Sequence, residues 1–185
     1  MDIAAAYNKH KNLKIAADEL GVKWQTLYVQ LRKLNIPVTG DKLKYGSNRD
    51  RLAARAEIEF QRLVPFAINQ NKVKFQSKFD YLVGNEKVDI KASHLKPGNK
   101  RFKQVRWAFS VKRQELCADF IVCFGMLDNS YKLFLIPGEC VRYYQTISIS
   151  NTGVSKWHQY AISPEDLTIF FKDLISDDGI TKDKS

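Results

Sequence analysis

The sequence has few cysteines, no long apolar run and far fewer acidic than basic residues. Its three cysteines, Cys117, Cys123 and Cys140, form no C-x-x-C pair, so neither a disulfide framework nor a zinc knuckle is expected. No stretch approaches the roughly 18 consecutive apolar residues that a membrane span needs. No basic segment opens the chain in the manner of a signal peptide. We therefore expect a reduced, cytoplasmic protein that does not bind a membrane.

The charge balance is the strongest compositional signal. The 185 residues include 30 Lys and Arg against 20 Asp and Glu, which gives a net charge of +10, and 44% are hydrophobic. A globular chain with this charge is expected to bind a polyanion. The charge is distributed unevenly along the chain. Residues 1–48 hold eight basic and four acidic residues, and residues 86–113 hold nine basic and two acidic residues. Residues 163–185 have a net negative charge, with three basic and six acidic residues.

The apolar pattern predicts a small all-α module followed by an α/β domain at 49–175. Apolar residues recur at helical spacing over 1–36, and residues 37–48, with Pro37, Gly40 and Gly46, are typical of a linker. Helices are expected at about 49–68 and 164–175. Gly84-Asn85 and residues 128–130 are expected to form hairpin turns, and residues 176–185 an acidic, poorly ordered tail. Strand-like runs lie at 79–83, 87–92, 105–111, 119–124 and 132–136.

Residues 13–34 have the spacing of a helix-turn-helix. This motif needs a small residue where the helices cross, a turn glycine and an aliphatic anchor, and Ala17, Gly21 and Leu27 occupy these positions. An ordinary pair of core helices would show much the same pattern, but Gly21 and the local positive charge favour DNA binding. The second helix would present groups able to contact phosphates and base edges, namely Lys23, Gln25, Thr26, Tyr28, Gln30 and Lys33.

Residues 75–93 are the most informative stretch, because two strand-like runs flank the Gly84-Asn85 turn. Asp89 and Lys91 are two residues apart on the second strand, so they share one face and leave the other to Val88 and Ile90. The turn places Asp80 across from residues 89–91. Two carboxylates and one amine are therefore expected to converge.

Such a cluster suits metal-assisted hydrolysis of a phosphodiester. Two carboxylates, from Asp80 and Asp89, with a backbone carbonyl, assigned to Ile90, supply the hard oxygen ligands that Mg²⁺ prefers, and Mn²⁺ can substitute. The metal would stabilise the charged transition state and lower the pKa of the attacking water. Lys91 would orient or help activate that water, or offset charge on the phosphate. The alternative is a surface hairpin with a simple cross-strand ion pair.

An acidic residue on the preceding helix extends the series. Glu57 shares a helix face with Ala53, Phe60 and Val64, so it is expected on the buried side, where a charge needs a partner or a metal. Glu59 lies on an adjacent stripe and is the weaker candidate.

In this order, a helix acid, a strand Asp and a D-x-K followed by a small hydroxyl residue, the sequence resembles the PD-(D/E)xK nuclease superfamily. The segments FDYLV and VDIKAS are similar to archaeal Holliday-junction resolvases and to phage or intron-encoded homing endonucleases, and CADFIVCFG and YKLFLIP resemble the next two strands of that homing group. The resemblance covers about residues 50–140. It implies a restriction-endonuclease-like α/β core with a mixed sheet flanked by helices, Mg²⁺-dependent DNA cleavage, and a homodimer or homotetramer in a bacterial, archaeal or phage-infected cell.

The resemblance also implies roles for single residues. Phe79 stands where the motif has a proline, and Asp89 replaces the more frequent Glu. No glycine immediately precedes the helix that carries Glu57, so the choice between Glu57 and Glu59 stays open. Glu57 corresponds to the helix acid, Asp80 to the central metal ligand and Asp89 to the variable acid. Lys91 corresponds to the catalytic lysine and Ser93 to the hydroxyl residue that follows it.

A basic loop follows the cluster directly. Its cations are expected to bind the DNA backbone near the scissile phosphate, although a charged surface loop would have the same composition. They are Lys96, Lys100, Arg101, Lys103 and Arg106.

The sequence therefore predicts a Mg²⁺-dependent, site-specific endonuclease acting on double-stranded DNA, of the homing or restriction type. A Holliday-junction resolvase is the alternative within the same class. A non-catalytic DNA-binding regulator would explain the charge and residues 13–34 equally well, but not the ordered acids and lysine.

Overall fold

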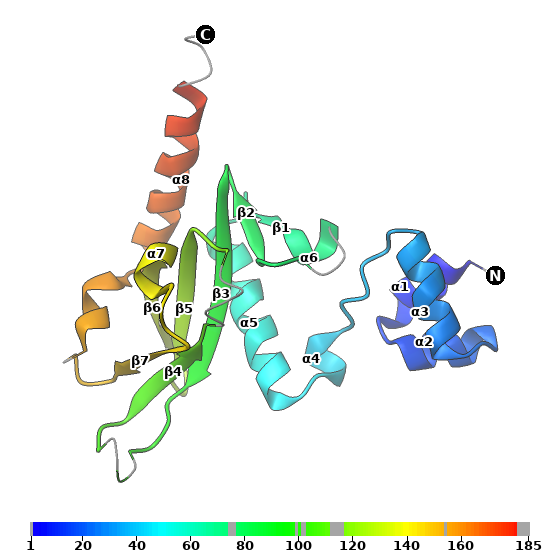
Figure 1. Ribbon diagram of the computed structural model, residues 1–185, viewed down its shortest axis with the longest axis horizontal. Coiled ribbons are helices and arrows are strands. Elements are labelled where there is room, and N and C mark those ends of the chain that lie inside the picture. Colours follow the sequence, from blue (N-terminus) through cyan, green and yellow to red (C-terminus); the bar gives the residue numbers. More distant parts are fainter. Residues whose placement is uncertain are drawn as a thin grey trace. The chain divides into compact units, whose positions relative to one another are not determined.

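The computed structural model describes residues 2–73, 77–98, 100, 103–111, 117–153 and 155–180, with side chains to residue 176. The chain forms two compact units (Figure 1). The first contains residues 1–55 and 69–77, and the second contains residues 56–68 and 78–185. The division falls inside a helix, at residues 55 and 56, whereas a boundary at residue 48 was expected.

Three short helices build the first unit: α1 (Ile3–His10), α2 (Leu13–Leu20) and α3 (Trp24–Lys33). The Asn12 side chain accepts hydrogen bonds from the amides of Lys14 and Ile15 and so caps α2. Gly21 ends α2 in the left-handed region with φ +66°, a conformation that costs a residue with a Cβ about 1–2 kcal/mol. The core between the helices consists of Tyr7, Ala16, Ala17, Leu27 and Leu31.

The segment after α3 is more ordered than a linker. Ile36 and Val38 pack against the helical core, the Gly40 amide donates to the Tyr7 hydroxyl at 3.0 Å, and the Asp41 amide donates to the Lys11 carbonyl at 2.8 Å. The chain then forms α4 (Lys42–Tyr45) and α5 (Asn48–Leu63). The residues expected as a linker therefore begin as part of the first unit.

Helix α5 ends five residues earlier than expected. Pro65 lacks an amide hydrogen and disfavours helical geometry at Val64. The Gln61 side chain instead donates to the carbonyls of the turn, at Val64, Pro65 and Ala67. Short elements β1 (Ile68–Asn69) and α6 (Gln70–Val73) follow.

The second unit is built on a mixed sheet of strand order β1-β2-β3-β5-β6-β8. Its other strands are β2 (Tyr81–Val83), β3 (Glu86–His94), β5 (Phe120–Met126), β6 (Tyr131–Pro137) and β8 (Ala161–Ile162). β3 pairs with β2 antiparallel and with β5 parallel, and β5 pairs with β6 antiparallel. Both expected hairpin turns are present, since Val83 pairs with Glu86 and Met126 with Tyr131. The expected α/β fold with a mixed sheet flanked by helices is confirmed.

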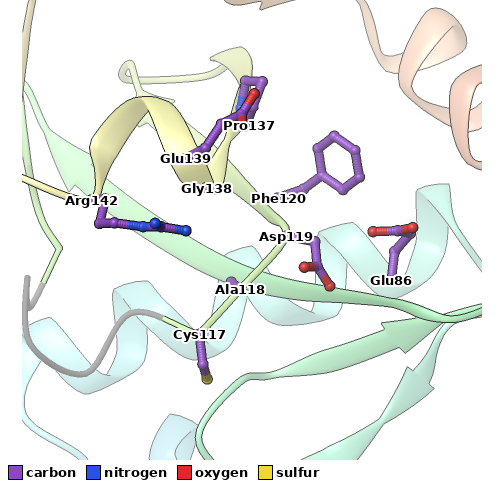
Figure 2. A pocket seen from close by; sticks show the side chains of 9 residues that line it. All are labelled: Glu86, Cys117, Ala118, Asp119, Phe120, Pro137, Gly138, Glu139 and Arg142. Carbon is purple, nitrogen blue, oxygen red and sulfur yellow. The ribbon is translucent and has the colours of Figure 1, made fainter.

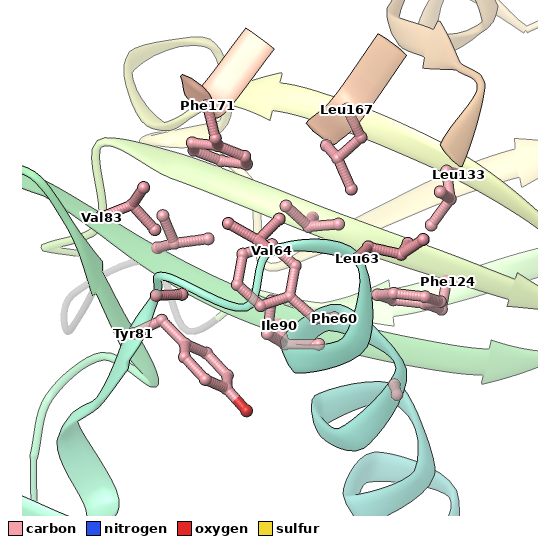
Figure 3. Packing of buried hydrophobic residues seen from close by; sticks show 14 residues of the cluster. Phe60, Leu63, Val64, Tyr81, Val83, Ile90, Phe124, Leu133, Leu167 and Phe171 are labelled. Atoms are coloured by element: carbon pink, nitrogen blue, oxygen red, sulfur yellow. The ribbon is translucent and has the colours of Figure 1, made fainter. Parts of the chain in front are cut away.

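Helices α5 and α8 (Pro164–Ile180) cover one face of this sheet. Phe60 and Val64 from α5, with Leu167 and Phe171 from α8, pack on Ile90 and other strand residues (Figure 3). The Thr168 hydroxyl donates to the Leu63 carbonyl at 2.9 Å and joins the two helices. Residues 176–180, which were expected in a poorly ordered acidic tail, belong to α8, which continues to Ile180; the rest of the expected tail, residues 181–185, lies outside the described part of the chain.

A second sheet covers the other face. β4 (Arg106–Ser110) and β7 (Thr146–Ser150) form an antiparallel pair, whose Trp107 and Ile149 pack with Cys123 and Phe134 of the main sheet. Helix α7 (Gly138–Val141) and the 3-10 helix η1 (Lys156–Tyr160) complete this layer. The strand at 106–110 was expected, but its place outside the main sheet was not. No helix of the described residues is long and apolar enough to cross a membrane.

Phe60→Ala should lower the free energy of unfolding of the second unit by about 3–5 kcal/mol. The ring is fully buried and lies 4.9 and 5.8 Å, centroid to centroid, from Tyr81 and Phe171. The matched control is Ile58→Ala on the same helix, because Ile58 is 55% exposed and its loss should cost less than about 0.5 kcal/mol. Urea denaturation followed by circular dichroism measures both, and equal losses would contradict this packing.

Candidate active site

Asp80 lies one residue before β2, where the pairing of β2 with β3 ends. Its amide donates to the Val88 carbonyl at 3.1 Å, and its carboxylate accepts a hydrogen bond from the Ile90 amide at 2.8 Å. The Ile90 amide thus donates to the Asp80 carboxylate, whereas in a continued β2–β3 ladder it would donate to a backbone carbonyl. The hairpin therefore fixes the Asp80 carboxylate against the middle of β3, as the sequence predicted.

Asp89 and Lys91 project from the opposite face of β3 to Val88 and Ile90. Val88 and Ile90 are buried in the cluster under α5 and α8. Lys91 Nζ lies 2.5 Å from Asp89 Oδ2, and their side chains are only 28% and 15% exposed. The expected convergence of two carboxylates and one amine on β3 is what the structure shows.

The surroundings change the protonation of both groups. Burial raises the pKa of Asp89 to about 6; the nearby Asp80 charge raises it further, while Lys91 opposes the shift. Burial by itself would lower the pKa of Lys91, but the Asp89 and Asp80 carboxylates outweigh it and raise that pKa. Lys91 is therefore a permanent cation at neutral pH, and the two acids compete for it.

Cys123 forms the wall of the site on β5. It pairs in register with Lys91 and is fully buried, and burial raises the pKa of its thiol. A neutral, inaccessible thiol is inert, which agrees with the expectation of a small core residue.

The two candidate helix acids have different surroundings. The Tyr81 hydroxyl donates to the Glu57 backbone carbonyl at 2.8 Å, and Glu57 is half-buried. Tyr81 belongs to the cluster under α5 and α8, so this contact lies on the sheet face opposite to Asp89 and Lys91. The Glu59 carboxylate is bound by the Arg62 guanidinium at 2.7 and 2.9 Å and by the Tyr131 hydroxyl at 2.6 Å. Arg62 chiefly, then Tyr131, lowers the pKa of Glu59. Glu59 is thus committed to structural contacts.

The expected set of metal ligands is only partly assembled. Among the residues that the structure describes, no three His, Cys, Asp or Glu side chains lie close enough together to hold one metal ion. Glu57 therefore does not join Asp80 and Asp89 as a direct ligand in this conformation. The sequence could not predict this, because residue spacing along the chain does not determine how far a helix lies from the sheet on which it packs.

Ser93 has a role that the sequence did not reveal. It is 4% exposed, its hydroxyl donates to the His94 carbonyl at 2.9 Å, and it accepts from the Ala108 amide at 3.0 Å. The bond from Ala108 ties the end of β3 to β4. The hydroxyl thus joins strands, and its part in chemistry stays a prediction.

The basic loop leaves the sheet between β3 and β4. The Lys96 and Arg106 backbones exchange two hydrogen bonds, at 2.7 and 3.1 Å, and form its neck. Lys96, Lys100 and Lys103 are exposed, whereas Arg106 is half-buried. Arg101 lies outside the described residues. Three of the five expected cations are thus accessible to a large anion.

The expected DNA-binding residues of α3 divide into two groups. Lys23, Gln25, Thr26 and Lys33 are exposed, whereas Tyr28 and Gln30 are half-buried beside the core residues Leu27 and Leu31. Sequence reasoning did not select Val29, which is 49% exposed. Its spacing of four residues from both Gln25 and Lys33 was the available signal.

A cavity of about 500 Å³ lies where β5 starts and β6 ends (Figure 2). Arg142 extends over Ala118, and Asp119 and Glu86 line the opposite side (Figure 2). The Asp119 carboxylate accepts from the Lys87 amide at 2.8 Å, so it holds β5 against β3. Neither the carboxylate pair nor Lys91 lines this cavity, and the candidate chemistry lies further along β3.

Comparison with known proteins supports the fold. One solved structure, of the bacterial homing endonuclease I-Ssp6803I, superposes with a TM-score of 0.50 at 14% sequence identity and covers 75% of this chain and 99% of that one. No protein-family model and no curated protein matches the sequence. The similarity is therefore one of fold.

The difference in free energy of unfolding between Asp89→Asn and the wild type should shift in favour of the variant as the pH rises. Because the Asp89 pKa is raised from 3.8 to about 6, the folded state holds the proton more tightly than the unfolded chain. The resulting stabilisation is present below about pH 4 and is lost as the pH rises through about 6, by up to about 3 kcal/mol. Urea denaturation of both proteins at pH 4, 5, 6 and 7 measures it. A difference that stays constant with pH would contradict a buried, titrating Asp89.

Proposed function

We propose that this chain is a Mg²⁺-dependent endonuclease that cuts double-stranded DNA at specific sites. The observation that carries the proposal is the convergence of Asp80, Asp89 and Lys91 on β3, in a chain with a net charge of +10. The homing endonuclease with a similar fold favours the homing type. Two half-buried acids amid cations suit a site that binds a metal and a phosphate together.

The residues fit a Mg²⁺ ion. The N–H and C=O of a strand residue point to the same side, so the Ile90 carbonyl faces the edge at which its amide meets Asp80. Two carboxylates and one carbonyl are hard oxygen donors, and Mg²⁺ usually keeps several waters beside one or two carboxylates. The raised pKa of Asp89, due to burial and then to the Asp80 charge, indicates a pair that a cation would stabilise. When bound, Mg²⁺ would neutralise phosphate charge and acidify a coordinated water.

Lys91 acts as a cation and hydrogen-bond donor. Its pKa is raised, so it has no free lone pair at neutral pH with which to remove a proton. Its ammonium lies 2.5 Å from Asp89 Oδ2, beside the carboxylate that would hold the metal. From there Lys91 would donate a hydrogen bond to the scissile phosphate or orient the attacking water.

Exposed cations would hold the DNA. Lys96, Lys100 and Lys103, on the loop after β3, would bind the DNA backbone near the site. Helix α3 would lie in a major groove. One such site cuts one strand, so a homodimer or homotetramer would cleave both. A regulator without activity would share the cations, but it would have no reason to bury Asp89 at a cost in stability.

Asp80→Asn and Lys91→Ala should each lower the rate of Mg²⁺-dependent DNA cleavage by at least about 100-fold, because each removes charge aimed at the metal or phosphate. Random-site duplex DNA is incubated with each protein and Mg²⁺, and the cut ends are sequenced. DNA affinity, measured in EDTA, should change little. The matched control is Asp173→Asn, an exposed acid on α8, which should keep full activity.

Full cleavage by either site variant would refute the assignment. Calorimetry with Mg²⁺ or Mn²⁺ gives a second readout, since binding heat should disappear in Asp80→Asn. A four-way junction digested beside the duplex library distinguishes a junction resolvase, because a resolvase would cut the junction alone.

Glu57→Gln should lower the rate of DNA cleavage, whereas Glu59→Gln should lower the stability of the fold. Glu57, the proposed helix acid, lies on α5 and contacts Tyr81 only through its backbone, so Glu57→Gln should act on the site indirectly and lower the cleavage rate about 10- to 100-fold. Glu59→Gln removes the charge that Arg62 pairs with and one of the two oxygens that accept from Arg62 and Tyr131, so it should lower the free energy of unfolding by about 1–2 kcal/mol and leave the rate of the folded enzyme unchanged. The reverse result would make Glu59 the helix acid.

A further inference from the structure

Helix α3 presents a mostly polar face with one apolar residue at its centre. Its opposite face supplies Leu27 and Leu31, both fully buried, to the core with α1 and α2. On the outward face, Gln25 and Lys33 lie four residues before and after Val29, and Thr26 and Arg32 lie three residues away on either side. All four of these polar residues are exposed, and Val29 is 49% exposed. On the side of α3 opposite to Leu27 and Leu31, Val29 is the apolar residue; Trp24, which is 43% exposed, lies at the start of the helix on the other side.

Val29 contributes nothing to the core that would explain its presence. A β-branched residue loses side-chain freedom in a helix, and half of this side chain stays in water. The other apolar residues of α3 lie differently. Trp24 and Leu34 are also exposed, at 43% and 58%, but they lie at the two ends of the helix, three residues from Leu27 and Leu31 and on the same side as these, whereas Val29 lies mid-helix on the opposite side. Val29 therefore suits a partner that meets the outward face.

The chemistry around Val29 matches one partner, the major groove of DNA. The groove accepts an α-helix, and its only apolar base-edge group is the C5 methyl of thymine. Arg32 and Lys33 supply positive charge for the phosphates at the groove walls. Gln25 and Thr26 can form hydrogen bonds with base edges beside the methyl.

We propose that Val29 recognises a thymine methyl and so determines part of the target sequence. This inference rests on the DNA-binding half of the proposed function and deepens it. A methyl buried against Val29 should contribute selectivity of about 3- to 5-fold at one position.

The experiment selects bound duplexes from a random-sequence library with the full-length protein in EDTA, where Mg²⁺-dependent cleavage does not occur. Wild type and the Leu34→Ser control should enrich the same motif, including one position that prefers thymine. Val29→Ser should lose the preference at that position alone. Circular dichroism verifies that the helices of each variant form.

Deoxyuridine, which lacks the methyl, gives the sharper test on the selected duplex. Replacing the thymine by deoxyuridine should weaken wild-type binding about 3- to 5-fold and leave Val29→Ser unaffected. Equal weakening in both proteins, or none at any thymine, overturns the inference, as does a wild type that enriches no motif. Failure of the nuclease proposal is separate, since it shows as absent Mg²⁺-dependent cleavage whatever sequence is bound.

Discussion

The hydrogen bond from the Ile90 amide to the Asp80 carboxylate connects the fold to the site. The bond lies one contact beyond the last residue pair of the β2–β3 hairpin. Its acceptor is a charged carboxylate oxygen, where a continued ladder would have a backbone carbonyl. Hydrogen bonds to a charged acceptor are stronger than neutral ones, so this bond both ends the ladder and orients Asp80. The Asp80 carboxylate held there adds to the effect of burial, which is the main cause of the raised pKa of Asp89, while Lys91 opposes it.

The second constraint is that β3 is covered on both faces. Val88 and Ile90 face the layer of α5 and α8, while Asp89 and Lys91 face the side covered by β4 and β7. Burial of both faces limits water around the charged pair, so each of the two charges is compensated chiefly by the other. The Ser93 hydroxyl contributes by binding the backbone of β4, which keeps the covering layer attached at the end of the same strand.

Much of this arrangement was predictable because it is local. The period of two along β3 places Asp89 with Lys91 and away from Ile90, and a tight turn at Gly84 brings Asp80 opposite them. The fold class follows from strand-like runs between helical segments. Helical periodicity likewise identified Gly21 and the core of the first three helices, although it favoured Gln30, which is half-buried, over the exposed Val29.

What the sequence by itself determined, then, is which residues share a strand face or a helix stripe, since these depend on backbone geometry within a few residues. Contacts between distant segments were decided by the tertiary structure. Tyr131 and Arg62 engage Glu59, Tyr81 binds the Glu57 backbone, and β4 leaves the main sheet to pair with β7. Residue spacing cannot encode such choices, because they depend on which of several chemically similar side chains the packing of the whole unit brings within hydrogen-bond distance.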